Sequence, residues 1–338
     1  MTQKFGVDDL NGVIAVMPTP SLPDAHHLRA QDTVDVAESR RVVRQLIGDG
    51  VNGIITNGTL GEMATLTLEE WKAFAAAVAE TVSEAAPDLP LFIGATGPHS
   101  RDTVSRMDFL HDLGVRGVFL GRPMWSALGP DALLDFYRGI AEAFPDMAII
   151  LYDNPEAFKG PIPTPIYAEL AKLPQVLGAK YTAITPKFSG DMSAVGDDLR
   201  LLPIESDWFV ARSLFPEQAS ACWSSSALCG PEPALRLRDL LFAGNLDAAR
   251  QLTHRIEWAY EPLLARTNFP EFSKYNIPLE KVRFDEAGYV KAGGARAPYH
   301  IVPDHYVSGA RENGRRWRTI ADELQREQPA PVGSGGVQ

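Results

Sequence analysis

A lysine closes one of the most apolar runs of the sequence, Leu177-Gly178-Ala179-Lys180. Lysine is rarely buried without a partner, so this position calls for an explanation. Where burial disfavours the ammonium form, part of the side chain is free amine, which can attack a ketone. For the lysine alone two interpretations stay open: a nucleophile that forms a Schiff base, or a side chain that reaches solvent or a carboxylate.

A tyrosine closes a second apolar run, residues 148–152, and is followed by Asp153, Asn154 and Pro155. A phenol at the end of a buried strand can pass protons between a substrate oxygen and an amine or water. The alternative is a buried Tyr152 with one hydrogen bond, followed by an ordinary turn at the Asn-Pro pair.

A third polar cluster reads Asn57-Gly58-Thr59-Leu60-Gly61-Glu62. Two glycines around a threonine predict a tight turn that exposes successive N–H groups, an arrangement suited to a carboxylate. The alternative is a turn with a structural role only, since glycine is common in turns.

Together, the three clusters could bind a 2-keto acid and activate it. The turn would hold the carboxylate, the amine would condense with the keto carbon, and the tyrosine would move protons. The protonated imine then accepts electrons, so that a carbanion at C3 is stored as an enamine and carbon–carbon bonds can be made or broken. This chemistry requires no metal and no cofactor, and we expect neither.

The elements that must position these clusters are short apolar runs that alternate with helical patterns. The runs are continuous, as expected for parallel strands buried on both faces. They fit a closed (β/α)8 TIM barrel or a doubly wound sheet, and no Gly-x-Gly-x-x-Gly follows the first run to favour a dinucleotide-binding sheet. We predict the barrel, in which all three clusters lie at one end; its eight expected strands are residues 13–16, 53–56, 91–95, 117–120, 148–152, 176–180, 200–204 and 220–223.

A C-terminal helical extension is expected after the barrel. We place the barrel at residues 1–232, the extension at 233–326, and a disordered tail at 327–338. Within the extension the sequence predicts a helical tract, then an irregular Gly/Pro/aromatic-rich segment, then a last helix; their limits are about 233–267, 272–303 and 313–326.

Charge and composition restrict the partners. The 338-residue chain has a net charge of −11, which argues against nucleic-acid binding. Its two cysteines, Cys222 and Cys229, are expected to be buried free thiols. No signal peptide or membrane-length apolar run is apparent, so we expect a cytoplasmic protein with a small-molecule substrate.

At this point the motifs and their order resemble the class I pyruvate aldolase superfamily that includes dihydrodipicolinate synthase and N-acetylneuraminate lyase. The segment 58–62 is similar to its Gly-Thr/Ser-Thr-Gly-Glu loop, 152–155 to its Tyr-Asn-x-Pro, and 178–180 to its Gly-x-Lys. The likeness runs from about Gly12 to Ala265. It implies a homo-oligomer, usually a tetramer, with Lys180 as the Schiff-base lysine and Tyr152 as the proton shuttle. It also implies that a pyruvyl carboxylate is held by the turn residues Asn57, Gly58, Thr59 and Leu60.

Departures from that pattern bear on the substrate. Leu60 replaces a second threonine, and residues 156–159 lack the arginine that would bind an amino-acid semialdehyde. Where dihydrodipicolinate synthase has Pro-Tyr-Tyr, residues 122–125 read Arg-Pro-Met-Trp. These changes predict a larger, more aromatic pocket with Trp125 and Trp223 as walls for a flat ring, although either tryptophan could be plain core.

The C-terminal extension resembles one branch of the superfamily, the hydratase-aldolases that act on trans-o-hydroxybenzylidenepyruvate or carboxybenzalpyruvate. The likeness lies in residues 272–278 and 293–299, and it implies that Asn154 and Asn276 are polar active-site residues. We therefore expect a lyase that hydrates an aryl-substituted unsaturated 2-keto acid and cleaves it to an aromatic aldehyde and pyruvate. A 2-keto-3-deoxy sugar-acid aldolase or dehydratase, a dihydrodipicolinate synthase-like condensing enzyme and a catalytically silent barrel remain alternatives. Three basic residues are candidates to bind an additional carboxylate on the ring: Arg122, Lys159 and Arg212.

Overall fold

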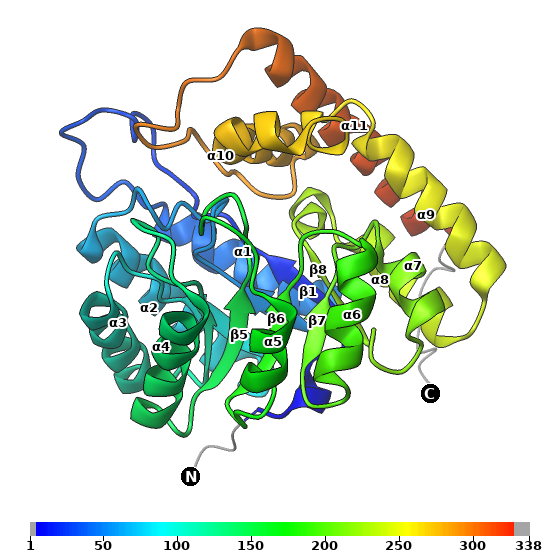
Figure 1. Cartoon of the computed structure of the whole chain (residues 1–338). Helices are drawn as coiled ribbons and strands as arrows, with labels where there is room; N and C mark the ends of the chain where they lie inside the picture. The colour runs from blue at the N-terminus through cyan, green and yellow to red at the C-terminus, as the bar shows by residue number, and fades with distance from the viewer. Residues whose placement is uncertain (1–4, 328–338) are drawn as a thin grey trace, which may run out of the picture.

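The computed structural model describes residues 5–327, apart from the side chain of Arg266. Eight parallel strands form one sheet in the order β7-β6-β5-β4-β3-β2-β1-β8 (Figure 1). The sheet closes between its two edge strands, because Ile204 and Trp223 form a parallel bridge and the Glu205 N–H donates to the Trp223 carbonyl at 3.1 Å. The strands are β1 (Gly12–Val16), β2 (Gly53–Ile55), β3 (Leu91–Gly94), β4 (Gly117–Leu120), β5 (Ala148–Tyr152), β6 (Val176–Lys180), β7 (Arg200–Leu202) and β8 (Ala221–Ser224).

Helices follow the strands and surround them, so the predicted (β/α)8 TIM barrel is confirmed. The second helix shows the capping box that its sequence encodes: the Thr67 hydroxyl accepts from the Glu70 N–H, and Glu70 accepts from the Thr67 N–H. The barrel helices are α1 (Val36–Asp49), α2 (Leu68–Ala85), α3 (Ser100–Asp112), α4 (Pro130–Ala143), α5 (Thr164–Leu170), α6 (Pro186–Val195), α7 (Trp208–Leu214) and α8 (Glu232–Phe242).

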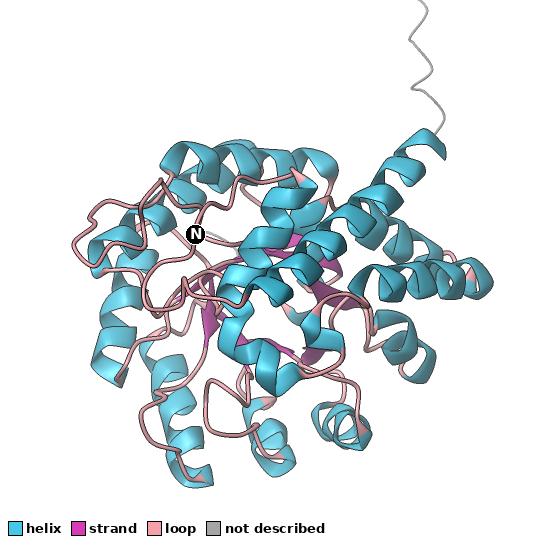
Figure 2. Cartoon of the chain, turned by 90° about the horizontal axis from the view of Figure 1, so that it is seen from above, coloured by secondary structure: helices cyan, strands magenta, loops and turns pink. Residues whose placement is uncertain are grey.

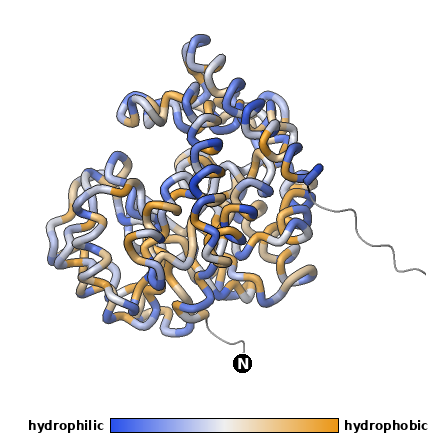
Figure 3. The backbone as a smooth tube through the Cα atoms, turned by 90° about the vertical axis from the view of Figure 1, so that its right-hand side faces the viewer, coloured by the Kyte–Doolittle hydropathy of each residue, from blue (hydrophilic) through white to orange (hydrophobic). Residues whose placement is uncertain are grey.

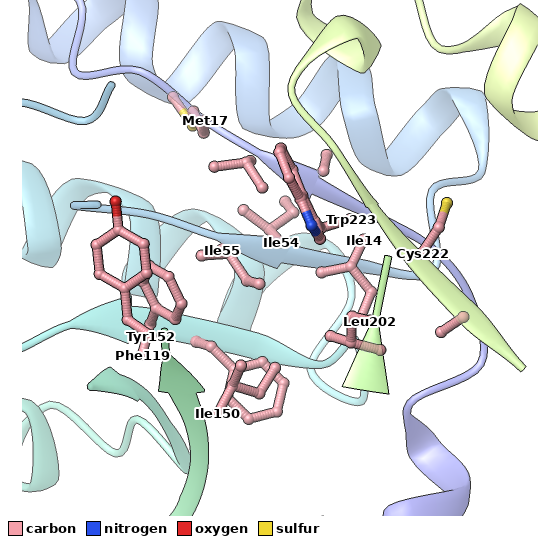
Figure 4. Packing of buried hydrophobic residues seen from close by; sticks show 14 of the residues in the cluster. Ile14, Met17, Ile54, Ile55, Phe119, Ile150, Tyr152, Leu202, Cys222 and Trp223 are labelled. Atoms are coloured by element: carbon pink, nitrogen blue, oxygen red, sulfur yellow. The ribbon is translucent and has the colours of Figure 1, made fainter. Parts of the chain in front are cut away.

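The core fills the barrel interior, where nearly every strand residue is buried. Figure 4 shows Ile14, Ile54 and Ile150 directed into this interior from three different strands. Both cysteines are free and buried, as expected. A closed and densely packed barrel holds the strand ends in fixed positions, which is what a site at those ends requires.

Three helices make up the C-terminal extension: α9 (Leu246–Tyr260), α10 (Phe269–Ala287) and α11 (Asp304–Glu327). Helix α10 lies across one end of the barrel, and α11 packs along α10 (Figures 1 and 2). The helices carry both hydrophilic and hydrophobic residues, as the colours of Figure 3 show. In α11 the buried residues include Trp317, Ile320 and Leu324.

Three sequence-based expectations for the extension were wrong. The predicted helical tract at about 233–267 is divided into α8 and α9, with a break at residues 243–245. Residues 272–303 are not irregular throughout, since α10 continues to Ala287 despite Pro278 inside it. Asn268 caps this helix by accepting from the Glu271 N–H, and Pro270 fits its first turn, where a proline loses no internal hydrogen bond. The last helix begins at Asp304 rather than near residue 313. Of the predicted tail, residue 327 ends α11 and residues 328–338 lie outside the described residues. No helix in the described part of the chain is long and apolar enough to cross a membrane.

Candidate active site

Tyr152 and Lys180 are the last residues of β5 and β6 and are register partners in the sheet. Residues paired in this way on parallel strands point their side chains to the same face. The Lys180 Nζ lies 5.6 Å from the centroid of the Tyr152 ring. The two predicted catalytic residues are therefore neighbours at one end of the barrel.

The amine of Lys180 lies in an apolar setting. Its Nζ is 3.4 Å from the centroid of the Trp223 ring, and it has no ion pair with any described residue. Burial lowers the pKa of Lys180 to about 7, while the negative charges of Glu280 and Glu205 act in the opposite direction. A substantial fraction of the side chain is thus free amine at neutral pH, as nucleophilic attack requires.

The hydroxyl of Tyr152 is the centre of a small hydrogen-bond network. The Asn154 Nδ2 donates to it at 3.0 Å and the Thr59 N–H at 3.3 Å. With both lone pairs occupied, the phenol donates its own proton to the Thr59 Oγ1, 2.5 Å away. The orientation of Asn154 follows from its Oδ1, which accepts from the backbone N–H groups of Glu156 and Ala157. Tyr152 therefore connects with Thr59 and Asn154, as a proton relay needs.

Packing fixes the Tyr152 ring. Phe119 lies beside it (Figure 4), with ring centroids 4.4 Å apart. Phe158 meets it edge-on, with ring centroids 5.2 Å apart. A Cβ at position 58 would lie 3.1 Å from the Phe119 ring, so Gly58 leaves the room that the two rings need. The hydroxyl is thereby held at the barrel mouth with little freedom to rotate away.

The 57–62 turn differs in one respect from its prediction. Its left-handed residues are Asn57 (φ 51°) and Glu62 (φ 59°), not the two glycines. Gly61 is required for space, because a Cβ there would lie 2.7 Å from the Asn57 backbone nitrogen. Asn57 is buried and forms the base of the turn, whereas Gly58, Thr59 and Leu60 line the cavity beside Lys180.

A buried cluster of charges holds this turn to the C-terminal extension. The carboxylate of Glu62 is fully buried and pairs with Lys281 at 2.6 Å and with Arg296. The Arg296 N–H also donates to the Glu62 Oε1 at 2.7 Å. Glu62, the last residue of the 57–62 turn, is thus anchored by two cations from outside the barrel.

A cavity of about 360 Å³ opens over Lys180 between the strand ends and α10. It is mostly apolar. Its apolar and aromatic lining includes Val16, Leu60, Phe119, Ile204, Trp223, Leu263, Ala265, Phe269 and Phe272. A second cavity of about 330 Å³ adjoins it, sharing Thr59, Tyr152, Asn154, Phe269 and Asn276. Flat apolar groups fit such surroundings better than polyhydroxylated ones.

The predicted binding residues divide into those inside and those outside these cavities. Trp223 lines the larger cavity with its Nε1 donating to the Tyr181 carbonyl at 2.8 Å. Asn276 lines both cavities from within α10, and its buried Oδ1 accepts no hydrogen bond from a described residue. Trp125 is 91% exposed and lines neither cavity.

The three basic candidates for an additional ring carboxylate also lie outside the cavities. Arg122 is buried in an ion pair with Asp153 and donates to the Gly160 carbonyl. Arg212 donates to the Ala219 carbonyl, and Lys159 is exposed. None of the three lines either cavity, so the structure does not bring them to the predicted ring site.

Sequence reasoning named Asn276 but missed Phe272 and Glu280, which α10 also brings to the site. Phe272, Asn276 and Glu280 are spaced by four residues and all line the larger cavity. This spacing places three side chains on one helix face. The pattern was present in the sequence, but the prolines at 270 and 278 favoured an irregular segment instead.

A TIM barrel with a low-pKa lysine on β6 and a tyrosine relay on β5 defines an enzyme of the class I aldolase type, a lyase that works through a Schiff base. The chain belongs to the dihydrodipicolinate synthetase family, whose pattern it matches over residues 9–299. It is 40% identical to the trans-O-hydroxybenzylidenepyruvate hydratase-aldolase of Pseudomonas aeruginosa over 96% of this chain and 97% of the relative.

Two further comparisons point in the same direction. The trans-2'-carboxybenzalpyruvate hydratase-aldolase of Nocardioides sp. (strain KP7) is 38% identical over 92% of this chain and 94% of the relative. The solved structure of PhdJ bound to a substrate intermediate superposes with a TM-score of 0.92 at 42% identity, covering 95% of this chain and 99% of PhdJ. The predicted family and its hydratase-aldolase branch are confirmed.

Proposed function

We propose that this enzyme hydrates an aryl-substituted unsaturated 2-keto acid and cleaves it to an aromatic aldehyde and pyruvate. The observation that carries the proposal is the position of Lys180, a lysine with its pKa lowered to about 7, at the floor of a largely apolar cavity beside Tyr152. The hydratase-aldolases named above are its relatives over nearly the whole chain, which supports the same reaction here.

Binding begins with the carboxylate of the substrate. The turn at Gly58, Thr59 and Leu60 lines the cavity next to the amine, and its N–H groups and the Thr59 hydroxyl are the donors we assign to this carboxylate. The keto carbon then faces Lys180, while the aryl group extends toward Trp223 and the aromatic residues of α10.

Hydration follows from the Schiff base. The Lys180 amine adds to C2 and water leaves, giving a protonated imine conjugated with the C3–C4 double bond. The cationic imine draws electrons from C4, the benzylic carbon, so a water molecule adds there and loses one proton. C3 gains a proton, and we assign these transfers to Tyr152 with Asn154 and Thr59.

Cleavage uses the same groups in reverse. Removal of the C4 hydroxyl proton breaks the C3–C4 bond, the aldehyde leaves, and the electron pair is stored as the enamine of pyruvate on Lys180. Protonation at C3 and hydrolysis of the imine then release pyruvate. Asn276 has a buried Oδ1 without a donor, and we assign it to accept the hydrogen bond of the C4 hydroxyl.

A sugar-acid aldolase remains the second candidate within the same chemistry. Its substrate carries several hydroxyls, each of which would need a polar partner on burial. Phe269, Phe272 and Leu263 line the same cavity as Lys180 and offer no such side-chain partners. The lining therefore supports the aryl substrate.

The proposal is tested by an ultraviolet assay of the purified enzyme with a panel of benzylidenepyruvates, with Lys180→Ala as control. These substrates are conjugated, so hydration and cleavage remove their absorbance. We expect rapid loss with pyruvate and an aldehyde as products, and no loss with the variant. Intact absorbance, together with a borohydride-reducible pyruvate adduct on Lys180, would instead assign the enzyme to the sugar acids.

We further propose that the enzyme acts in the cytoplasm as a homo-oligomer, with a tetramer as the expected form. The support is membership of the dihydrodipicolinate synthetase family and the acidic net charge of −11, which favours solubility. Light scattering coupled to size-exclusion chromatography should give four times the chain mass, and a single-chain mass would contradict the proposal.

A further inference from the structure

A chain of buried polar side chains lies behind the cavity, on the side of the extension. It links the β7–α7 loop with η2 (Ser226–Cys229), α9, α10 and α11. Each member is almost fully enclosed, and none belongs to the relay around Tyr152. Its members are Glu205, Ser225, Ser226, Tyr260, Glu280, Arg283 and Asn313.

Glu280 is the carboxylate of this network that reaches the cavity of Lys180. The Nε and Nη2 of Arg283 both donate to its Oε2, at 2.9 and 2.7 Å. The Oε1 accepts no hydrogen bond from a described residue. One oxygen is thus held by Arg283, and the other has no donor among the residues that the structure describes.

Arg283 is itself fixed on every side. Its Nη1 donates to the hydroxyl of Ser226 at 2.9 Å and to the Asn313 Oδ1 at 3.1 Å, and its Nη2 donates to the hydroxyl of Ser225 at 2.8 Å. Its side chain is completely buried. Such a rigid guanidinium holds the carboxylate of Glu280 in one place relative to β6.

Three other carboxyl groups lie near Lys180: Glu205 also raises its pKa, and Asp153 and Asp207 line the same cavity. Glu205 is completely buried, its pKa is raised mainly by that burial, and Tyr260 donates to its Oε1 at 2.6 Å. Burial also raises the pKa of Tyr260 and Cys229, so both stay neutral. Asp153 is paired with Arg122, and Glu280, paired with Arg283, is the carboxylate whose charge raises the pKa of Lys180 most.

We infer that Glu280 is a positioning residue that supplies the counter-charge of the Schiff base on Lys180, with Arg283 holding it in place. A protonated imine carries a positive charge, and a cation in an apolar cavity is costly without a nearby negative charge. The inference rests on the Schiff base of the proposed function but not on the identity of the aryl substrate. A carboxylate at fixed distance stabilises the ammonium and the imine alike.

Because Glu280 is expected to stabilise the ammonium and the protonated imine equally, its role can be tested with pyruvate alone. Below the pKa of Lys180, ammonium and pyruvate give the protonated imine and water, so charge is conserved and affinity is independent of pH. Above it, free amine, pyruvate and a proton combine, so affinity falls about tenfold per pH unit as long as the imine stays protonated. The break between the two regimes is expected near the lysine pKa of about 7.

Glu280→Gln keeps the shape and an acceptor for Arg283 but removes the charge. We expect the break to move down by about one pH unit, so that pyruvate binds about tenfold more weakly at pH 8 and with unchanged affinity at pH 5.5. The readout is the fraction of protein that gains the pyruvate mass on borohydride reduction, titrated over pyruvate concentration at several pH values. Glu280→Asp should restore the wild-type break.

Asn313→Ala is the matched structural control, because it removes another partner of Arg283 without changing charge. A merely structural role predicts the same effect for both variants, whereas the inference predicts a shifted break for Glu280→Gln alone. Should Glu280→Gln fail to fold, the double variant Glu280→Gln/Arg283→Met removes the whole ion pair and should shift the break in the same direction. An unmoved break in the folded variant overturns the inference, while a wild-type protein that forms no adduct overturns the Schiff base itself.

Discussion

The Nζ of Lys180 lies 3.4 Å from the centroid of the Trp223 ring, and the indole is held there by its hydrogen bond to the Tyr181 carbonyl. A ring face attracts a cation and so favours the ammonium form. Burial outweighs this attraction, because the pKa of Lys180 falls to about 7. Trp223 therefore excludes water from the amine while still offering its face to the cationic imine.

We predict that Trp223→Phe lowers kcat/KM about tenfold, since phenylalanine loses the indole hydrogen bond and is the weaker partner for a cation. Steady-state assays with one benzylidenepyruvate measure the effect. Trp258→Phe is the control, because Trp258 lies on α9 with 41% of its surface exposed and lines neither cavity. Equal activities in the two variants would contradict the role given to Trp223.

The lowered pKa of Lys180 predicts a pH dependence. The ammonium form cannot attack a ketone, so kcat/KM should fall as the pH drops below about 7 and level off above it. Rates measured between pH 5.5 and 9 with a non-titrating substrate analogue of constant charge give the curve. An acid limb centred near the ordinary lysine value of 10.5 would show that burial does not control the amine.

The same burial predicts that the lysine costs stability. A lysine with its folded pKa lowered from 10.5 destabilises the fold at all pH values below 10.5, and the cost grows until the pH reaches about 7. Lys180→Met should therefore raise the free energy of unfolding at pH 7 by on the order of 3 kcal/mol. Urea denaturation at pH 7 and pH 9.5 checks it, and the gain should be smaller at the higher pH.

Tyr152→Phe tests the relay separately from the Schiff base. The variant loses the hydroxyl that binds Thr59 and Asn154 but keeps the ring between Phe119 and Phe158. We expect kcat to fall about 10²- to 10⁴-fold. Mass spectrometry after borohydride reduction should still find the pyruvate adduct at Lys180, and wild-type turnover would exclude Tyr152 as the proton carrier.

Local patterns in the sequence predicted the barrel part of the site well. Tyr152 and Lys180 each end a continuous apolar run, and a closed barrel brings strand ends together whatever the rest of the chain does. The strand limits followed from the same runs because burial on both faces leaves no polar residue inside them.

Contacts between distant segments could not be read from the sequence in the same way. Glu280 meets the cavity because α10 crosses the barrel mouth, and no local pattern sets where that helix docks. Trp125 was expected to line the substrate pocket because it is a large aromatic residue. Its actual position, in an exposed loop, depends on tertiary packing. Asn57 looked like a ligand because of its motif, yet its role in the structure is the left-handed turn.

The link between Glu62 and Arg296 is another long-range contact, and it makes a stability prediction. Arg296 is 3% exposed, pairs with Glu62 and donates its Nε to the Thr33 hydroxyl at 2.7 Å. Arg296→Met removes one of the two cations paired with the buried carboxylate, so we expect a loss of about 3 kcal/mol in the free energy of unfolding. Because Glu62 ends the turn that we assign to the substrate carboxylate, KM should rise more than kcat falls.

Arg40→Met is the control. It removes an ion pair with the half-exposed Glu80 and should cost at most about 1 kcal/mol with unchanged KM. Equal losses in the two variants, measured by urea denaturation, would mean that the buried cluster does not hold the turn.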